Sequence, residues 1–297
     1  MDVRVLSPLT ASDGENLALY RWADEESSKD AARQTQTSRG VVLLVHGLGE
    51  HAGRYDALAS VVRSWGFDVR GYDQRGHGYS GGKPGTLPEP DALLTDLADV
   101  IDDVRSHCPG QPLILLGHSL GGLVASRLVS LKLRQVDALV MSSPALDAGL
   151  GVVQQLLLAV LPGLLPNLTV SNGLNARYLS HDARVVQAYQ ADRLVHNRIS
   201  PRLGKFISTA GPAVIAAAPS WQTPTLLLYA GQDKLVNPAG SRRFAQAAGA
   251  SPRVKPGCVT AQCFDDQYHE IFNELQATPV FLALKAWLDL RFRQPRL

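Results

Sequence analysis

Short, largely apolar runs recur along the chain and alternate with longer stretches in which apolar and polar residues are interspersed. Runs of about five apolar residues are typical of strands buried on both faces of a parallel sheet, whereas the longer stretches predict helices. We therefore expect an α/β fold, with a mostly parallel central sheet flanked by helices. The expected strands are 41–45, 113–117, 137–141 and 225–229, and the expected helices include 55–65, 91–105 and 120–131.

The N-terminal part of the chain follows a different pattern. The turn residues Asp13-Gly14-Glu15-Asn16 separate two apolar segments, 3–6 and 17–22. This arrangement predicts an antiparallel hairpin. The segment 23–39 that follows is polar and has no apolar periodicity, so we expect a loop there.

One interval interrupts the alternation of strands and helices. About 80 residues separate the expected strand ending at Met141 from the one starting at Thr225, far more than a connection between neighbouring elements needs. Helix-like pieces at 152–161 and 183–195 lie within it. We interpret this interval as an inserted helical cap.

Composition adds mainly exclusions. The 297 residues carry a formal net charge of +2, and 45% are hydrophobic, so no electrostatic footprint for a nucleic-acid partner is expected. The sequence has no run of 18 apolar residues and no signal-type N-terminus, which predicts a cytoplasmic protein.

The three cysteines, Cys108, Cys258 and Cys263, do not describe a disulfide framework. Cys258 and Cys263 are close enough in sequence to pair in an oxidised protein. Further ligands at zinc-site spacing are missing around them, so we expect neither a metal nor another cofactor.

A motif of specific chemical meaning follows the run 113–117. The chain continues Gly117-His118-Ser119-Leu120-Gly121-Gly122 and then becomes helix-like. This strand–turn–helix setting of G-x-S-x-G is typical of a nucleophilic serine. A Cβ at Gly117 or Gly121 would collide with backbone in so sharp a turn, and Ser119 itself is expected to be strained. The alternative is a tight turn with an incidental serine. We predict that Ser119 is the nucleophile and that Gly117, His118 and Gly121 support it.

A serine hydroxyl needs a base that a third group orients. In proteins with this type of nucleophile elbow, the acid and then the histidine follow the serine along the chain. Asp233 stands just beyond the strand-like run 225–229, and His269 is the only histidine after Asp233. Asp233 could otherwise be an ordinary turn or helix-capping residue. We predict a catalytic triad of Ser119, Asp233 and His269. Glu270 and Glu274 are expected to cap or salt-bridge the following helix.

The oxyanion of an acyl-transfer intermediate needs two backbone donors. One is expected at Leu120, directly after the nucleophile. The other is expected at Leu48, because the glycines of His46-Gly47-Leu48-Gly49 let the backbone turn its amides inward. Gly47 therefore supports this loop. His46 either buttresses the loop or is an ordinary packed core histidine.

Several of these motifs resemble one family. The chain is similar to the monoacylglycerol lipase and lysophospholipase branch of the α/β hydrolases, which belongs with the serine aminopeptidase-like S33 hydrolases. The resemblance covers about residues 40–290. It rests on His46–His51, Arg54-Tyr55, Tyr72–Gly82, Gly117–Gly122 and His269–Glu274.

The resemblance implies an α/β-hydrolase fold whose helical cap is inserted after the sixth strand. The core then comprises 1–143 and 219–297, and the cap comprises 144–218. It also implies that Asp73–Gly82 is a glycine-rich loop after the fourth strand, in which Asp73 and Arg75 form an internal pair.

The segment 150–168 is apolar nearly all round, unlike a cap helix with a polar outer face. Packing within the cap or a dimer contact would explain this. The alternative that we favour is an acyl-binding pocket lined by Leu156, Leu157, Val160 and Leu161. Peripheral contact with a membrane or micelle through the same segment is a further possibility.

We therefore expect a serine carboxylic-ester hydrolase that acts, without a cofactor, on monoacylglycerol-like single-chain lipid esters. A lysophospholipase or a broad short- and medium-chain carboxylesterase would use the same residues. A haloperoxidase-like perhydrolase would also share the triad. The sequence predicts no oligomeric state.

Overall fold

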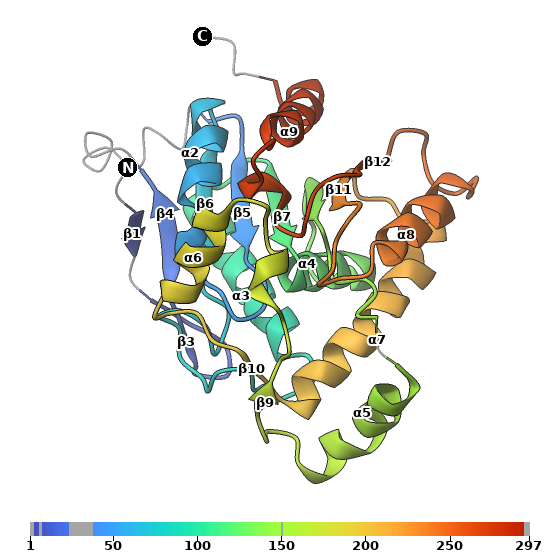
Figure 1. Ribbon diagram of the computed structural model, residues 1–297. Coiled ribbons are helices and arrows are strands. Elements are labelled where there is room, and N and C mark those ends of the chain that lie inside the picture. The colour runs from blue at the N-terminus through green and yellow to red at the C-terminus, as the bar shows by residue number, and fades with distance from the viewer. Residues whose placement is uncertain (1–2, 6–7, 24–37, 150, 294–297) are drawn as a thin grey trace.

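A single mixed sheet forms the centre of the computed structural model, which describes residues 3–5, 8–23, 38–149 and 151–293 (Figure 1). Its eight strands have the order β1-β4-β6-β5-β7-β8-β11-β12. The strands are β1 Val3–Val5, β4 Leu19–Trp22, β5 Val41–Val45, β6 Asp68–Tyr72, β7 Leu113–His118, β8 Ala138–Ser142, β11 Thr225–Ala230 and β12 Val259–Phe264.

Only the N-terminal edge of the sheet is antiparallel. β4 pairs antiparallel with β1 and with β6, while the remaining neighbours from β6 to β12 pair in parallel. The four expected strands are present as β5, β7, β8 and β11, and every residue of these strands is buried. The predicted α/β fold with a mostly parallel sheet is confirmed.

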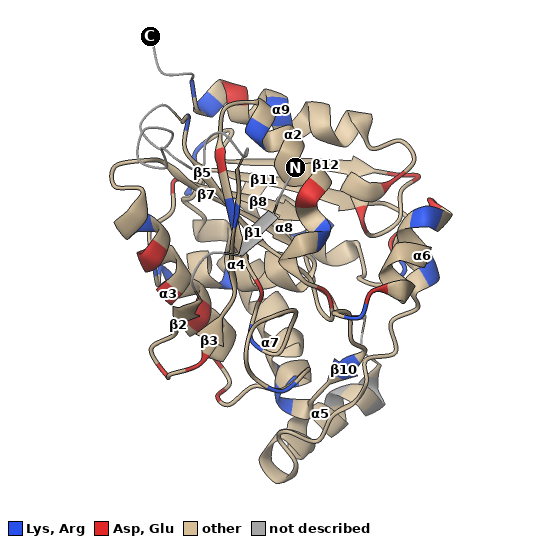
Figure 2. Cartoon of the chain, turned by 90° about the vertical axis from the view of Figure 1, so that its left-hand side faces the viewer, with Lys and Arg blue, Asp and Glu red and all other residues tan. Residues whose placement is uncertain are grey.

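Helices cover both faces of the sheet, which creates two apolar cores (Figure 2). The helices α2 Asp56–Ser64 and α9 Thr278–Arg291 pack on one face. The other face is covered by α3 Ala92–His107, α4 Leu120–Leu131 and α8 Ala239–Gly249. The short 3-10 helices η2 Ala52–Tyr55 and η5 Ile271–Asn273 precede α2 and α9.

The connection between β8 and β11 follows the sixth strand of the sheet and extends away from it at the lower end of Figure 1. Its first helix, expected at 152–161, continues through Pro162 to Leu164, and the helix expected at 183–195 ends at Ala191. The elements are α5 Val152–Leu164, β9 Val170–Ser171, η3 Ala176–Tyr178, α6 Ala183–Ala191, β10 Arg198–Ile199, α7 Pro201–Ala217 and η4 Ala218–Ser220.

Helix α7 was not predicted from the sequence, because Gly204, Gly211 and Pro212 weaken its helical pattern. Packing explains two of these residues. A Cβ at Gly211 would lie 2.3 Å from the carbonyl oxygen of Leu146, and a Cβ at Gly204 would lie 2.9 Å from the side chain of Leu158. The glycines therefore let α7 approach the chain that leaves β8 and the helix α5.

The predicted N-terminal hairpin is present. Val3–Val5 pairs with residues 20–22, and the small strands β2 Leu9–Thr10 and β3 Asn16–Leu17 pair beside the turn. Most of the expected loop 23–39 lies outside the described residues. In the described part of the chain, no helix has the length and apolarity needed to cross a bilayer. All three cysteines are free thiols, so Cys258 and Cys263 are unpaired in this structure.

The expected internal pair of Asp73 and Arg75 is wrong. Asp73 accepts hydrogen bonds from the Tyr20 hydroxyl and from the backbone N–H of Ala52 and Tyr79. Arg75 donates instead to Asp96 of α3, with 2.6 Å between Nε and Oδ2. Asp73 and Arg75 are close in sequence but do not bond each other, because each side chain bonds a different part of the fold.

The Arg75–Asp96 pair generates a stability prediction. Both side chains are buried, so Arg75→Met leaves a carboxylate uncompensated in the interior. We expect a loss of about 3–5 kcal/mol in the free energy of unfolding, measured by urea denaturation. Arg134→Met is the matched control, because its partner Asp102 is exposed and its loss should cost less than about 1 kcal/mol. Equal effects of the two substitutions would show that burial does not strengthen the Arg75–Asp96 pair.

Candidate active site

Ser119 occupies the sharp turn between β7 and α4. Its backbone has φ 53° and ψ −119°, a region that side chains other than glycine rarely adopt. The backbone N–H of Ser119 donates to the carbonyl of Ser142 at 3.0 Å, and the Ser119 carbonyl accepts from Leu123 and Ala145. Bonds to α4 and to the chain leaving β8 thus hold the strained residue in place.

Two glycines make this turn sterically possible. A Cβ at Gly121 would lie 2.0 Å from the carbonyl oxygen of Val45, and a Cβ at Gly117 would lie 2.4 Å from the carbonyl oxygen of Gly121. These are backbone atoms, which cannot move aside as a flexible side chain can. The glycines therefore let α4 begin directly against β5 and β7.

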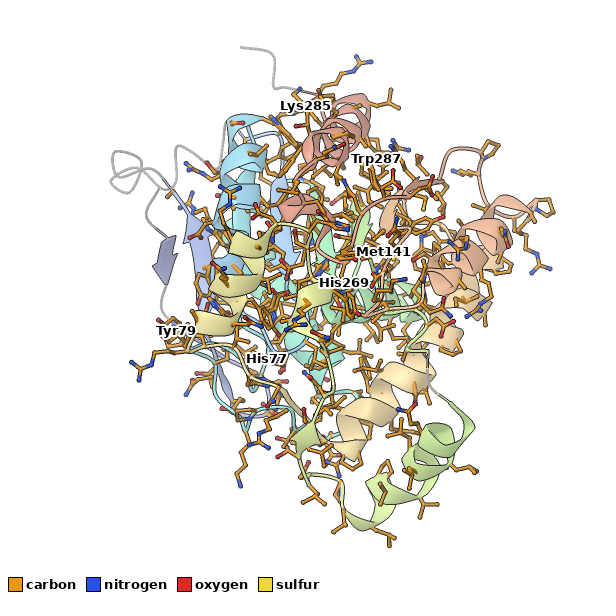
Figure 3. All side chains as sticks on the ribbon, viewed as in Figure 1. His77, Tyr79, Met141, His269, Lys285 and Trp287 are labelled. Carbon is orange, nitrogen blue, oxygen red and sulfur yellow. The ribbon has the colours of Figure 1, made fainter. Side chains whose placement is uncertain are left out.

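Asp233 and His269 meet although 36 residues separate them. His269 Nδ1 lies 2.6 Å from Asp233 Oδ2, and Asp233 Oδ1 accepts from the backbone N–H of Leu235 and Val236. Figure 3 labels His269 near the centre of the molecule. Because Asp233 holds Nδ1 of His269, the other ring nitrogen, Nε2, is the one available for proton exchange.

The charges of this pair shift both pKa values. Burial by itself would raise the pKa of Asp233, but His269 and the hydrogen bonds hold it below its usual value. Burial likewise favours the neutral imidazole, yet the Asp233 carboxylate outweighs it and raises the pKa of His269. The arrangement therefore stabilises an imidazolium, as a general base requires after it has taken a proton.

His118 lies beside His269 but in a different electrostatic environment. The two ring centroids are 4.7 Å apart, and His118 Nδ1 lies 3.1 Å from the Ser142 hydroxyl. Burial and the neighbouring His269 lower the pKa of His118 to about 4. His118 is therefore neutral near pH 7 and packs against the site without adding charge.

The loop 46–50 lies against the elbow and lines the same cavity as Ser119. The buried His46 accepts the N–H of Gln74 through Nε2, and its Nδ1 donates to the Gly47 carbonyl at 2.8 Å. His46 is thus both a core residue and a buttress of the loop. Leu48 and Leu120, the predicted oxyanion donors, line the same cavity as Ser119.

This cavity has a volume of about 400 Å³ and joins the predicted catalytic residues to the segment 144–218. The Ser119 and His269 side chains line it. Most of the remaining lining is apolar and comes from α5, α7 and the chain between them, including Leu157, Leu158, Leu161, Leu165, Leu168, Val170, Leu174, Leu179, Ile199 and Ile207.

The expected pocket residues of α5 divide into two pairs. Leu157 and Leu161 line the cavity. Leu156 and Val160 are not among the residues that line it, and 64% and 59% of their surface is exposed. Within α5, Leu157 and Leu161 follow each other at a spacing of four residues, as do Leu156 and Val160, so the two pairs form neighbouring stripes along the helix. Because all four residues are apolar, the sequence alone did not distinguish the two pairs.

A buried group of charges beside Ser119 and His269 was not predicted from the sequence; Glu50, Arg54 and Glu270 belong to it and line the cavity. Arg54 bonds both Glu50 and Glu270, and Glu274 bonds His181. Glu270 thus forms an ion pair with Arg54 and Glu274 a hydrogen bond with His181, so both carboxylates bond distant segments of the chain. Within the described residues, no group of three or more His, Cys, Asp or Glu side chains is arranged to hold a metal ion.

The chain is similar to known hydrolases. Residues 36–276 match the family described as serine aminopeptidase, S33. The monoacylglycerol lipase of Mycolicibacterium smegmatis is 33% identical, over 84% of this chain and 88% of that protein. An uncharacterized abhydrolase domain-containing protein of Dictyostelium discoideum is 31% identical over 98% of this chain, which spans only 30% of that protein's length.

A solved structure agrees with these sequence relatives. The crystal structure of Paleococcus ferrophilus monoacylglycerol lipase has a TM-score of 0.76 and 33% sequence identity, and the match covers 86% of this chain and 95% of that one. Sequence and fold therefore point to the same group of proteins. The chain belongs to the serine aminopeptidase S33 family, in the monoacylglycerol lipase branch of the α/β-hydrolase superfamily.

Proposed function

We propose that this protein is a serine carboxylic-ester hydrolase that cleaves monoacylglycerols and similar single-chain lipid esters. One observation carries the proposal: Ser119 and the Asp233-bonded His269 line one cavity whose remaining lining is mostly apolar. An acyl chain fits the apolar part of such a cavity. The monoacylglycerol lipases among its relatives support the same substrate class.

The proposed reaction proceeds through an acyl-enzyme. His269, oriented by Asp233, takes the hydroxyl proton of Ser119 as the oxygen attacks the ester carbonyl. The backbone N–H groups of Leu48 and Leu120 bind the oxyanion. His269 then protonates the departing alcohol, and water activated by the same imidazole releases the fatty acid.

We propose that segment 144–218 acts as the cap over this site. Its helices α5 and α7 supply most of the apolar lining, which suits the acyl chain. Tyr189 of α6 also lines the cavity, and its ring packs on Arg54 at 4.8 Å. A phenol at this position provides a polar group beside the reacting ester for the alcohol portion of the substrate.

The nucleophile is tested by Ser119→Ala. We expect ester hydrolysis to fall to background while the fold is retained, because the alanine cannot form an acyl-enzyme. A fluorophosphonate probe should add one adduct to the intact mass of the parent protein and none to the variant. Hydrolysis retained by a folded Ser119→Ala protein would contradict the proposal.

The substrate class is tested by acyl-chain length. A series of p-nitrophenyl esters and monoacylglycerols should show kcat/KM rising from acetyl to medium and long chains, because each added methylene buries apolar area worth about 0.8 kcal/mol. Leu161→Trp should shorten the longest chain accepted, since Leu161 lines the cavity. Leu164→Trp, on the same helix but 70% exposed, is the matched control.

Three outcomes of this series separate the alternatives. Activity confined to acetyl and butyryl esters would favour a short-chain carboxylesterase and overturn the lipid substrate. Preference for lysophospholipids over monoacylglycerols of the same acyl chain would favour a lysophospholipase. Perhydrolysis that exceeds hydrolysis in the presence of peroxide would favour a perhydrolase.

We further propose that the outward face of α5 rests on a membrane or micelle surface. Leu156, Val160 and Leu164 are all more than half exposed and follow one another at helical spacing, and α5 carries no Lys, Arg, Asp or Glu (Figure 2). Exposed apolar area of this kind gives peripheral affinity without insertion. A cytoplasmic location remains a prediction of the sequence.

Vesicle binding tests this contact. Replacing Leu156, Val160 and Leu164 together by serine should reduce sedimentation with neutral phosphatidylcholine vesicles by tenfold or more, by the loss of about 25 cal/mol per Å² of apolar area. Turnover of a soluble p-nitrophenyl ester should stay unchanged, because none of these three side chains lines the cavity. Unchanged vesicle binding of the triple variant would refute membrane contact through α5.

A further inference from the structure

A chain of buried charges lies beside the proposed catalytic residues, along the wall of the same cavity, and joins two separate loops. Its members are Glu50, Arg54 and Glu270, of which both carboxylates are about 95% buried. Glu50 belongs to the loop that carries Leu48, and Glu270 directly follows His269. Burial of three charges is costly unless each is bonded in a defined geometry, so these contacts constrain the position of both loops.

On the side of the elbow, the chain of charges ends on Gly47. Glu50 Oε1 accepts the Gly47 backbone N–H at 2.6 Å and the Tyr55 hydroxyl at 2.7 Å. A Cβ at Gly47 would lie 2.8 Å from Glu50 Oε1 and 3.2 Å from Ser119 Cβ. The Glu50 carboxylate therefore fixes the peptide group between His46 and Gly47, one residue before Leu48, and Gly47 lies directly against Ser119.

On the other side, the chain of charges ends beside His269. Arg54 Nη1 and Nη2 donate to the two oxygens of Glu270 at 2.8 and 3.0 Å, and Nη1 also donates to Glu50 Oε2. Glu270 is anchored further by Asn273 Nδ2 at 2.7 Å. A planar guanidinium that bonds two carboxylates at once sets both their separation and their relative orientation.

The Arg54 guanidinium keeps the buried Glu50 carboxylate ionised. Burial alone would raise the pKa of Glu50, but the Arg54 guanidinium overcomes it and lowers that pKa to about 2. The Arg54–Glu50 contact is therefore a charge-assisted hydrogen bond near neutral pH.

We propose that Arg54 is a positioning residue, which holds the oxyanion loop 46–50 and the histidine loop 268–274 at a fixed separation so that the Leu48 amide and His269 act on the same carbonyl. This role rests on the proposed function and adds to it. Small displacements of such groups are costly, since a 1 Å misplacement reduces rates by about 100-fold.

The rate at which a fluorophosphonate labels Ser119 provides the test. Labelling needs the base and the oxyanion donors, yet it does not involve a glycerol leaving group. For Arg54→Ala we expect a fall of about 100-fold, and for Arg54→Lys an intermediate rate, because lysine keeps the charge but not the bidentate geometry. Arg184→Ala, which removes the pair between the exposed Arg184 side chain of α6 and the N-cap residue Asp182, is the control and should label at the parental rate.

Two further measurements separate positioning from a general structural defect. Guanidinium ion added to Arg54→Ala should restore part of the labelling rate, because it can occupy the space between the two carboxylates. In Glu270→Gln the charge that helps to raise the pKa of His269 is lost, so this pKa falls. Since only neutral His269 accepts a proton, the acid limb of kcat/KM should move to lower pH while kcat decreases.

The outcomes distinguish this role of Arg54 from the proposed function. If Ser119 of the parent protein is not labelled, the proposed function itself fails. If the parent is labelled and Arg54→Ala is labelled equally fast, only the role of Arg54 is overturned. A loss of monoacylglycerol turnover in Arg54→Ala with normal labelling would make Arg54 an alcohol-binding residue and would likewise overturn positioning. If Arg54→Ala does not fold, Arg54→Lys and Glu270→Gln replace it in the test. Labelling of both variants at the parental rate would then overturn the positioning role of Arg54.

Discussion

The close approach of α4 to β5 and β7 is the constraint on which the rest of the structure depends. Gly121 lies against the backbone of Val45, and Gly117 lies against Gly121, so the chain must reverse within one residue. That residue is Ser119, held at φ 53°. Strain of this kind persists only where surrounding contacts outweigh it. Here the backbone bonds of Ser119 to Ser142 and Ala145 tie the elbow to the chain that leaves β8.

The side chains around the elbow are held by hydrogen bonds to residues far away in the sequence. His46 is fixed by Gln74 after β6, and His269 is fixed by Asp233 after β11. Because neighbouring parallel strands end at the same edge of the sheet, loops far apart in the sequence converge there. The buried Arg54 then joins two of these loops through its bonds to Glu50 and Glu270.

The segment between β8 and β11 has the opposite character. Its helix α5 presents one apolar face to the cavity and another to solvent, and only its packing on α7 determines which is which. A core built on strong backbone constraints thus carries a segment with apolar residues both along the cavity and on its exposed surface. The division fits a catalytic centre that must be rigid beside a lipid site that must adapt to its substrate.

The sequence by itself determined the α/β fold, the elbow at Ser119, and the order in which Asp233 and His269 follow it, because buried strands and glycine-dependent turns have local signatures. Helix α7 escaped prediction since its glycines serve packing. The pairing of Arg75 with Asp96, the outward direction of Leu156 and Val160, and the bridge from Glu50 through Arg54 to Glu270 were decided only by the tertiary structure. Each of these depends on which distant segment lies opposite a side chain, and no local pattern of residues records that.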